Sequence, residues 1–351
     1  MLIGLYKSEF PQFQVNRIEI YKRILKYNNI PFIELHIDEQ DFWDKVKKVD
    51  LFLFRWAHVD NDHQLVHTIL PVIENYLSVK CFPDLNTCWH YDDKVRQYYL
   101  LKSLEYPVVE SYIFWQKENA LEWAKHADYP VVFKLKKGAG SENVILLNNY
   151  PETKKIISRM FGKGMSASGI KHKGKIKYKS FENFLRRKAD QYFLKKIRHI
   201  EPQTWQIAKN YVLFQKFLPD NKFDTRVTTI GKRAFAFRRF VRKNDFRASG
   251  SGNIDYNKDD VDLRLIKLSL KISEELKFQS MAYDFLFNKN NQPEICEISY
   301  TYVDHVIYQC TGYWDEELKW HSGNFWPQFL HLKDALNLDN LKQPIINDIK
   351  S

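Results

Sequence analysis

The first 82 residues alternate short apolar runs with amphipathic stretches. The apolar runs occupy residues 2–6, 32–37, 51–54 and 79–82, and the stretches between them, with apolar positions at helical spacing, occupy residues 15–28, 39–48 and 62–77. Strands that alternate with helices predict a parallel sheet with helices on its faces. We therefore expect a small Rossmann-like domain here, although it has no glycine-rich dinucleotide fingerprint.

A glycine-containing loop follows in the middle of the chain. Two apolar runs, 131–135 and 143–147, read as buried strands on either side of Gly138, Gly140 and Ser141. Backbone N–H groups of such a loop can close over an anion, which Lys134 reaches from the first strand. No Gly-Lys pair in the chain is followed by Ser or Thr, so this is not a Walker A loop. An ordinary hairpin is the alternative.

A hairpin that turns at Gly231 is expected over residues 223–239. The period of two along a strand allows Arg226 and one of Arg238 or Arg239 to project toward a common site. Arg247, which precedes a short Ser/Gly run, adds a further cation. A helix over about 259–277 then leads into a second hairpin.

The second hairpin, residues 282–299, carries two carboxylates. Asparagines between 288 and 291 predict its turn, and a turn centred on 290 and 291 places Asp284 opposite Glu297. Opposed like charges destabilise a sheet unless a cation lies between them. Strand alternation adds the oxygen of Ser299 on the same face, and oxygen ligands without His or Cys favour Mg²⁺ held with a phosphorylated substrate. The alternative is an edge hairpin with unrelated, solvated carboxylates.

The net charge of +11 is concentrated in one segment. Residues 151–200 contain 15 Lys and Arg and three Asp and Glu, an excess of 12 positive charges, so the rest of the chain is close to neutral. We interpret residues 151–206 as an insertion whose helix packs an apolar stripe and solvates its charges. Attraction to an anionic membrane surface, to a large anionic substrate or to nucleic acid stays open as an alternative.

Composition excludes several classes. The chain of 351 residues is 44% hydrophobic, which predicts a globular protein of two or three domains. The amino terminus lacks the apolar core of a signal peptide, and no apolar run approaches the length of about 18 residues that a membrane span needs. Four cysteines without CxxC spacing indicate a reducing compartment. We expect a cytoplasmic location, with attachment to the inner face of the membrane as the alternative.

The order and spacing of these motifs, between about residues 92 and 300, resemble the ATP-grasp ligases. The resemblance implies an α/β fold with an N-terminal Rossmann-like parallel-sheet domain, a small lid and a C-terminal antiparallel sheet. In this sequence those parts correspond to residues 1–104, 105–213 with the basic insertion at 151–206, and 214–351.

The resemblance also implies ATP and Mg²⁺ as cofactors and assigns roles to particular residues. Those expected to contact ATP are Lys94, Lys134, Gly138, Gly140, Ser141, Gln215, Lys216, Phe217, Leu218 and Asp224. The catalytic arginines are expected to be Arg226, Arg238 and Arg247, and the metal ligands Asp284, Glu297 and Ser299.

Two positions depart from the family pattern. Ser299 stands where the family carries Asn, and Ala282 stands where D-alanine–D-alanine ligases carry an Arg that stabilises an oxyanion. Arg226, Arg238 or Arg247 would take that role.

The implied reaction activates a carboxylate as an acyl phosphate and joins it to an amine, with ADP and phosphate as the other products. The carboxyl-terminal part is similar to ATP-grasp proteins associated with bacterial surface polysaccharide synthesis, so the expected partners are small-molecule or sugar-linked carboxylates and amines. Two alternatives remain. One is an ATP-grasp kinase acting on a hydroxyl, and the other is a non-catalytic nucleic-acid-binding protein, which explains the charge but not the spacing of Asp284 and Glu297.

Overall fold

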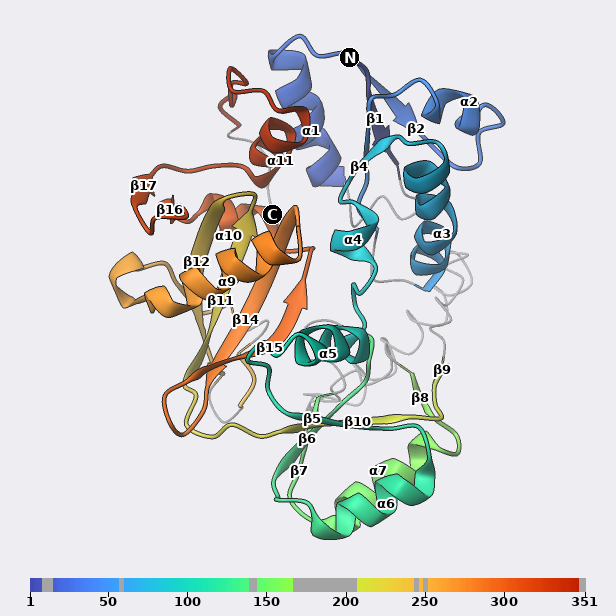
Figure 1. Ribbon diagram of the computed structural model, residues 1–351, viewed down its shortest axis with the longest axis vertical. Helices are drawn as coiled ribbons and strands as arrows, with labels where there is room; N and C mark the ends of the chain where they lie inside the picture. Colours follow the sequence, from blue (N-terminus) through green and yellow to red (C-terminus); the bar gives the residue numbers. More distant parts are fainter. Residues whose placement is uncertain are drawn as a thin grey trace, which may run out of the picture. The chain divides into compact units, whose positions relative to one another are not determined.

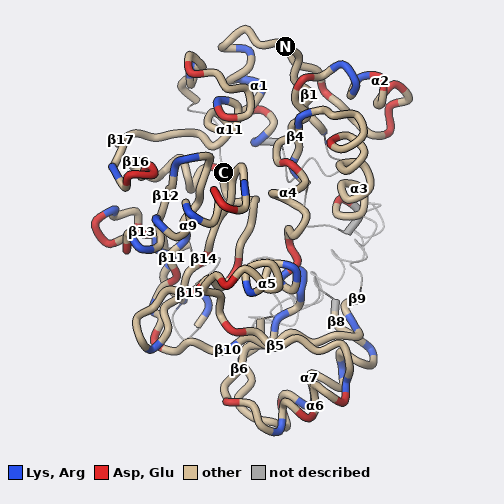
Figure 2. The backbone as a smooth tube through the Cα atoms, in the orientation of Figure 1, with Lys and Arg blue, Asp and Glu red and all other residues tan. Residues whose placement is uncertain are grey.

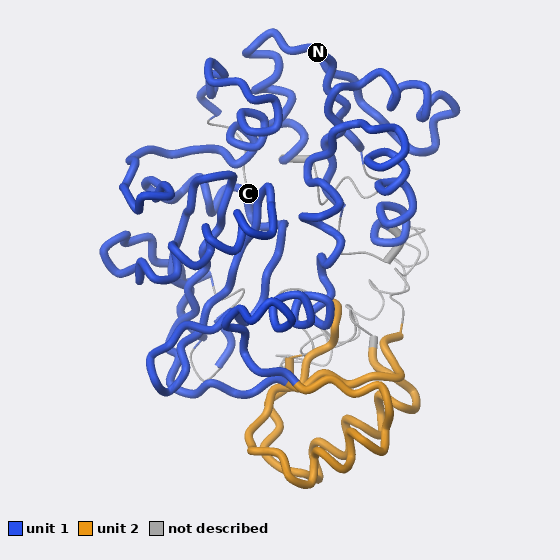
Figure 3. Tube along the Cα trace, viewed as in Figure 1, with its two compact units in different colours: residues 1–111, 139–141, 215–351 blue, residues 112–138, 142–214 orange. Residues whose placement is uncertain are grey.

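The computed structural model describes residues 1–7, 15–56, 60–138, 144–166, 207–242, 246–248 and 252–346. The chain forms two compact units (Figure 3). The first contains residues 1–111, 139–141 and 215–351, and the second contains residues 112–138 and 142–214. The finer division into three domains stays a prediction. In the described part of the chain, no helix is long and apolar enough to cross a membrane.

The amino-terminal sheet of the first unit has four parallel strands in the order β2-β1-β3-β4 (Figure 1). Its elements are β1 (Ile3–Tyr6), α1 (Val15–Tyr27), β2 (Phe32–Leu35), α2 (Phe42–Val46), β3 (Leu51–Leu53), α3 (Asp60–Pro71), the π-helical turn η2 (Val72–Tyr76), β4 (Lys80–Phe82), α4 (Leu85–Cys88) and α5 (Lys94–Ser103). The predicted alternation of strands and helices is confirmed. All four residues of β1 are buried, which explains its uninterrupted apolar run.

The second sheet of this unit is antiparallel, in the order β15-β14-β11-β12-β16-β17, with β13 beside β12. Its elements are β11 (Phe223–Ile230), β12 (Arg233–Phe240), β13 (Ile254–Asp255), the 3-10 turn η3 (Lys258–Asp260), α9 (Leu263–Glu275), β14 (Ser280–Phe287), β15 (Pro293–Ser299), α10 (Asp304–Tyr308), β16 (Gly312–Trp314), β17 (Trp320–Ser322) and α11 (Pro327–Leu336). Both hairpins predicted from the sequence are therefore present.

One face of the antiparallel sheet packs against the helix α9, and the other face carries charged side chains. Leu265 and Ile266 of α9 pack against Val227 and Tyr283 on one face. Strand alternation places the side chains of Asp224 and Arg226 on the other face. The helix α11 continues the core to the amino-terminal sheet, because Leu332 packs with residues of α1 and β1.

The second unit is built around the sheet order β5-β10-β6-β7. Its elements are β5 (Ser111–Phe114), α6 (Lys117–His126), β6 (Val131–Lys134), β7 (Ile145–Leu147), α7 (Tyr150–Met160), β8 (Met165–Ser166), β9 (Ile207–Ala208) and β10 (Val212–Lys216). The antiparallel pairing of β6 with β7 confirms the strands expected around the glycine loop. Most of the basic insertion, residues 167–206, lies outside the described residues, so the helix expected in the insertion stays a prediction.

Candidate active site

The hairpin of β14 and β15 places Asp284 directly opposite Glu297, as predicted. The centre of the turn, however, differs from the predicted one. Residues 285–287 pair with residues 295–293, so the turn is centred on Asn290 alone. A register shift next to Asp284 then leaves Cys296 unpaired in the ladder, as in a β-bulge. The bulge restores the opposition of the two carboxylates.

Two arginines hold the Asp284 carboxylate from the neighbouring strands. Arg226, paired with Asp284 in register, donates from Nε to Oδ1 at 2.6 Å and from Nη2 to Oδ2 at 2.8 Å. Nη2 of Arg239 lies 2.8 Å from Oδ2. Burial alone would raise the pKa of Asp284, but the two guanidinium groups hold this pKa well below its ordinary value. Asp284 is therefore ionised at neutral pH.

Arg239, rather than Arg238, joins Arg226 in this cluster. Arg239 lies opposite Asp224 and binds its two carboxylate oxygens through Nε and Nη2, each at 2.7 Å. Arg238 projects from the other face of β12, where Nη2 lies 2.6 Å from Asp260 and Nε 3.1 Å from Oδ2 of Asp255. The geometry thus corrects the expectation that Arg238 belongs to the site.

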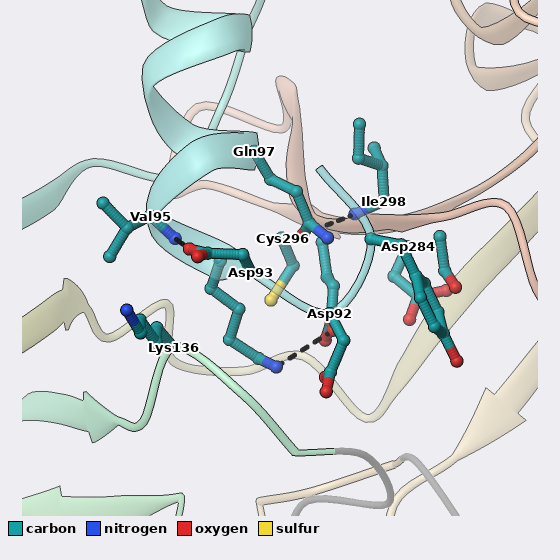
Figure 4. Close-up of polar contacts among 12 residues, drawn as sticks. Asp92, Asp93, Val95, Gln97, Lys136, Asp284, Cys296 and Ile298 are labelled. Carbon is teal, nitrogen blue, oxygen red and sulfur yellow. Dashed lines mark hydrogen bonds and ion pairs between the residues drawn. The ribbon is translucent and has the colours of Figure 1, made fainter. Parts of the chain in front are cut away.

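Helix α5 brings Lys94 to the same carboxylates. Asp93 caps the helix by accepting hydrogen bonds from the backbone N–H of Val95 (Figure 4) and from that of Arg96, each at 3.1 Å. Its first turn also contacts β15, where Gln97 Oε1 accepts from the N–H of Ile298 at 3.4 Å (Figure 4). The cap at Asp93 and the contact of Gln97 with β15 together fix the position of Lys94 at the start of α5.

The ammonium of Lys94 lies 3.1 Å from Glu297. Its side chain is only 10% exposed. Burial alone would lower the pKa of Lys94. The negative charge of Glu297 outweighs this effect, so the pKa of Lys94 is raised above its ordinary value.

Together these residues form a paired-charge cluster on one face of the sheet. Its six members are Lys94, Arg226, Arg239, Asp224, Asp284 and Glu297. With three cations and three anions the cluster is neutral. Figure 2 marks the Lys and Arg positions along the backbone in blue and the Asp and Glu positions in red.

The donor set fits Mg²⁺ through Asp284 and Glu297. Carboxylate oxygens are the protein ligands this ion takes, and it commonly uses one or two of them together with substrate phosphates and water. Among the described residues there is no group of three or more His, Cys, Asp or Glu suited to a metal. Both oxygens of Asp284 accept hydrogen bonds from arginines, so a metal would displace at least one of these contacts.

The Ser299 hydroxyl is directed elsewhere. It donates to the carbonyl of Thr301 at 2.8 Å and accepts from the Thr301 N–H at 3.2 Å, a local turn just past β15. The assignment of Ser299 as a third ligand therefore has no support in the geometry.

The segment expected to hold the adenine continues from β10. Gln215 is buried, and its amide group donates to Ser111 Oγ at 3.3 Å and accepts from the Cys296 thiol at 3.5 Å. The N–H of Lys216 donates to the carbonyl of Glu110, while its side chain is exposed. The following residues are Phe217, whose ring meets Phe246 edge-on, and the buried Leu218.

The remaining assignments stay predictions. Lys134 is buried at the end of β6 in the second unit, where Gly138 has a φ of 115° that favours glycine. Gly140 and Ser141 lie outside the described residues. Arg247 belongs to the short described stretch 246–248.

No protein-family model matches the chain, and no curated protein does so either. Solved structures do resemble it. N5-carboxyaminoimidazole ribonucleotide synthetase from Thermotoga maritima is 14% identical with a TM-score of 0.57, over 96% of this chain and 76% of that one. D-alanyl-alanine synthetase A from Vibrio cholerae is 10% identical with a TM-score of 0.54, over 86% and 88%.

A third similar structure is the biotin carboxylase domain of a 2-oxoglutarate carboxylase from Hydrogenobacter thermophilus. It is 11% identical with a TM-score of 0.54, over 96% of this chain and 70% of that one. All three are ATP-grasp enzymes. The chain therefore has the ATP-grasp fold, as the motifs predicted.

Proposed function

We propose that the protein is an ATP- and Mg²⁺-dependent ligase that joins a carboxylate to an amine. The observation that carries the proposal is the paired-charge cluster, which sets Asp284 and Glu297 opposite each other in a chain with the ATP-grasp fold. In the proposed reaction a carboxylate oxygen attacks the γ-phosphorus of ATP and ADP leaves. The amine then attacks the acyl carbon, and phosphate leaves with that oxygen as the amide forms.

The cluster is suited to the electrostatic problem of the first step. A carboxylate brought within about 4 Å of a phosphate oxygen meets a repulsion of roughly 4 kcal/mol per charge pair at an effective dielectric of 20. Lys94, Arg226 and Arg239 come from three different elements and are held in place by their carboxylate partners. Preorganised cations of this kind stabilise developing charge without reorganisation at the moment of reaction.

Asp284 and Glu297 would hold Mg²⁺, which when bound supplies positive charge to the phosphate oxygens. An arginine donor released from Asp284 is then free to turn toward the phosphates. The cluster is neutral before the nucleotide binds, so Mg²⁺ would offset part of the negative charge that the nucleotide brings.

The other nucleotide contacts in the proposal follow from the motif order. Lys134 with the loop around Gly138, Gly140 and Ser141 would cover the phosphates, the backbone of residues 215–218 would hold the adenine, and Arg247 would add a third arginine. We also propose that the substrates include a sugar-linked carboxylate or amine used in surface polysaccharide synthesis, with the basic insertion attracting an anionic substrate or membrane. This part rests on the resemblance of the carboxyl-terminal segment and on the charge of residues 151–206.

Product analysis tests the proposal. Purified protein is incubated with Mg²⁺, ATP and panels of carboxylates and amines, and ADP and phosphate are measured. A ligase releases phosphate only when both substrates are present, and an isotopic label in the carboxylate oxygen appears in the phosphate. A stable phosphorylated product without free phosphate would establish a kinase instead.

Two glutamates on the same strand provide matched variants for this assay. Glu297→Gln should abolish turnover because it removes a carboxylate of the cluster. Glu294→Gln should keep turnover, since Glu294 accepts a hydrogen bond from Asn288 beside the turn. Equal activity of the two variants would contradict the proposed role of Glu297.

A further inference from the structure

Two arginines meet one aspartate at the point where the order of the parallel sheet reverses. The chain runs from β1 outward to β2 and then returns to β3 on the other side of β1. In open α/β sheets, ligands bind outside the carboxyl ends of the strands at such a switch point. Here Arg17 lies in the first turn of α1, which follows β1, and Arg55 lies two residues beyond β3. Both face Asp304, the first residue of α10.

The two ion pairs differ in strength. Arg17 Nη2 lies 2.7 Å from Oδ1 of Asp304, and the two side chains are 7% and 11% exposed. Burial alone would lower the pKa of Arg17. The negative charge of Asp304 outweighs this effect, so the pKa of Arg17 is raised above its ordinary value. Arg55 is 24% exposed, and its Nη1 lies 3.9 Å from the other oxygen. One carboxylate therefore faces two guanidinium groups, and Arg55 is the loosely held partner.

Buried N–H donors at the same edge of the sheet point to an acceptor. The Nε of Arg17 and the indole N–H of Trp56 are both buried and have no hydrogen-bond partner among the described residues. Buried donors of this kind are normally satisfied by a protein group, water or a ligand. Two arginines and one aspartate leave one positive charge without a partner of opposite sign. An oxyanion accepts several hydrogen bonds and would also balance that charge.

Four buried tyrosines interact electrostatically with Arg55. Burial raises the pKa of Tyr21, Tyr91, Tyr300 and Tyr302, and the positive charge of Arg55 opposes this rise at each of them. All four therefore stay protonated at neutral pH. The Tyr300 hydroxyl already accepts from the backbone N–H of Trp56 at 3.3 Å, which leaves its own hydrogen to donate.

This edge of the sheet is connected to the paired-charge cluster through β15. Tyr300 lies three residues beyond Glu297, so their Cα atoms are at most about 11 Å apart along an extended chain. A substrate of modest size can thus reach both. We propose that Arg55, supported by Arg17, anchors an oxyanion group of the substrate, a carboxylate or a phosphate separate from the group that reacts. The inference rests on the proposed function, because it gives that ligase a substrate with an additional anionic group.

Thermal unfolding with small oxyanions tests this site. Succinate and inorganic phosphate are added separately at constant ionic strength, and their dissociation constants are obtained from the concentration dependence of Tm. The wild type should be stabilised by at least one probe, and the stronger probe tells whether the site prefers carboxylate or phosphate. Arg55→Gln should weaken binding about tenfold or more, as expected for loss of a charged hydrogen bond. Arg264→Gln, an exposed arginine on α9, should bind the probe like the wild type.

Asp304→Asn separates a ligand site from a purely structural ion pair. It removes the carboxylate that balances the arginines, so the free protein should lose stability while its affinity for the probe rises. No probe-dependent shift in the wild type would overturn the proposal, and so would unchanged probe binding in Arg55→Gln.

A non-hydrolysable ATP analogue with Mg²⁺ distinguishes the two proposals. Arg55→Gln should keep the nucleotide-induced shift of the wild type while losing the shift caused by the probe. If the wild type responds to the probe but not to the nucleotide, the anion site stands and the ligase proposal fails.

Discussion

Arg239→Met would remove the arginine shared by two carboxylates of the cluster. Asp224 loses its bidentate partner, and Asp284 keeps only Arg226. Both carboxylate side chains are little exposed, at 12% and 11%. Breaking a buried ion pair from one side costs about 3–5 kcal/mol, because a charge is left without compensation. For a unit of this size that corresponds to a fall in Tm of roughly 6–20 °C.

The loss should depend on pH in a defined direction. In the wild type the pKa of Asp284 is depressed, so its stabilising contribution is complete above the unfolded value of about 3.9. In the variant the stranded carboxylates have raised pKa values, and the folded state takes up protons more readily than the unfolded state. The difference in unfolding free energy between the two proteins should therefore be largest near pH 7 and shrink toward pH 5. Mg²⁺ should stabilise the variant more than the wild type.

Urea unfolding followed by tryptophan fluorescence at several pH values measures these effects. Arg238→Met is the matched control, one position along the same strand. Its partners Asp255 and Asp260 are 29% and 44% exposed, so the expected loss is at most about 1 kcal/mol. Equal losses in the two variants, or a loss in Arg239→Met that does not change with pH, would refute the reasoning.

Three further predictions concern stability. Lys94→Met should cost about 1–3 kcal/mol in urea unfolding, because the Glu297 carboxylate loses its cation, and an unchanged midpoint would contradict that pairing. Burial and the charge of Arg17 hold the pKa of His331 well below its usual value, so His331 should contribute a fall in stability of about 1.4 kcal/mol per pH unit below pH 6.5, in addition to the fall from the buried His90, and His331→Gln should reduce the slope by that amount; identical slopes would contradict the assignment. Gly231→Ala should lower Tm more than Gly252→Ala, since both have positive φ but, of the two, only at Gly231 would a Cβ meet another group, the Asp334 carboxylate; equal losses would show that the contact relaxes freely.

The fold was largely predictable because its strands are short apolar runs bounded by clear turn signals. The opposition of Asp284 and Glu297 was predicted for an incomplete reason, since one residue fewer in the turn is offset by the bulge at Cys296. Bulges have no reliable signature in a single sequence.

The choice between Arg238 and Arg239 was open in the sequence although a signal existed. A two-residue turn at 231 and 232 pairs Ile230 with Arg233, and counting outward from this pair places Arg239 opposite Asp224. Turn length therefore decides which arginine faces the carboxylates.

Contacts between distant segments were beyond prediction. Lys94 meets Glu297 and Arg17 meets Asp304 across more than 200 residues, and neither meeting follows from local periodicity. They depend on how the helices α5 and α1 pack against the rest of the first unit.

The central claim is that the paired-charge cluster binds a nucleotide through Mg²⁺. It is tested most directly by the Tm of the wild type, Glu297→Gln and Glu294→Gln with a non-hydrolysable ATP analogue, with and without Mg²⁺. At about 100 times its dissociation constant the analogue should stabilise the wild type by roughly 2.7 kcal/mol. We expect a shift that requires Mg²⁺, is kept in Glu294→Gln and is lost in Glu297→Gln. A full shift without Mg²⁺, or in Glu297→Gln, or no shift in the wild type, would contradict it.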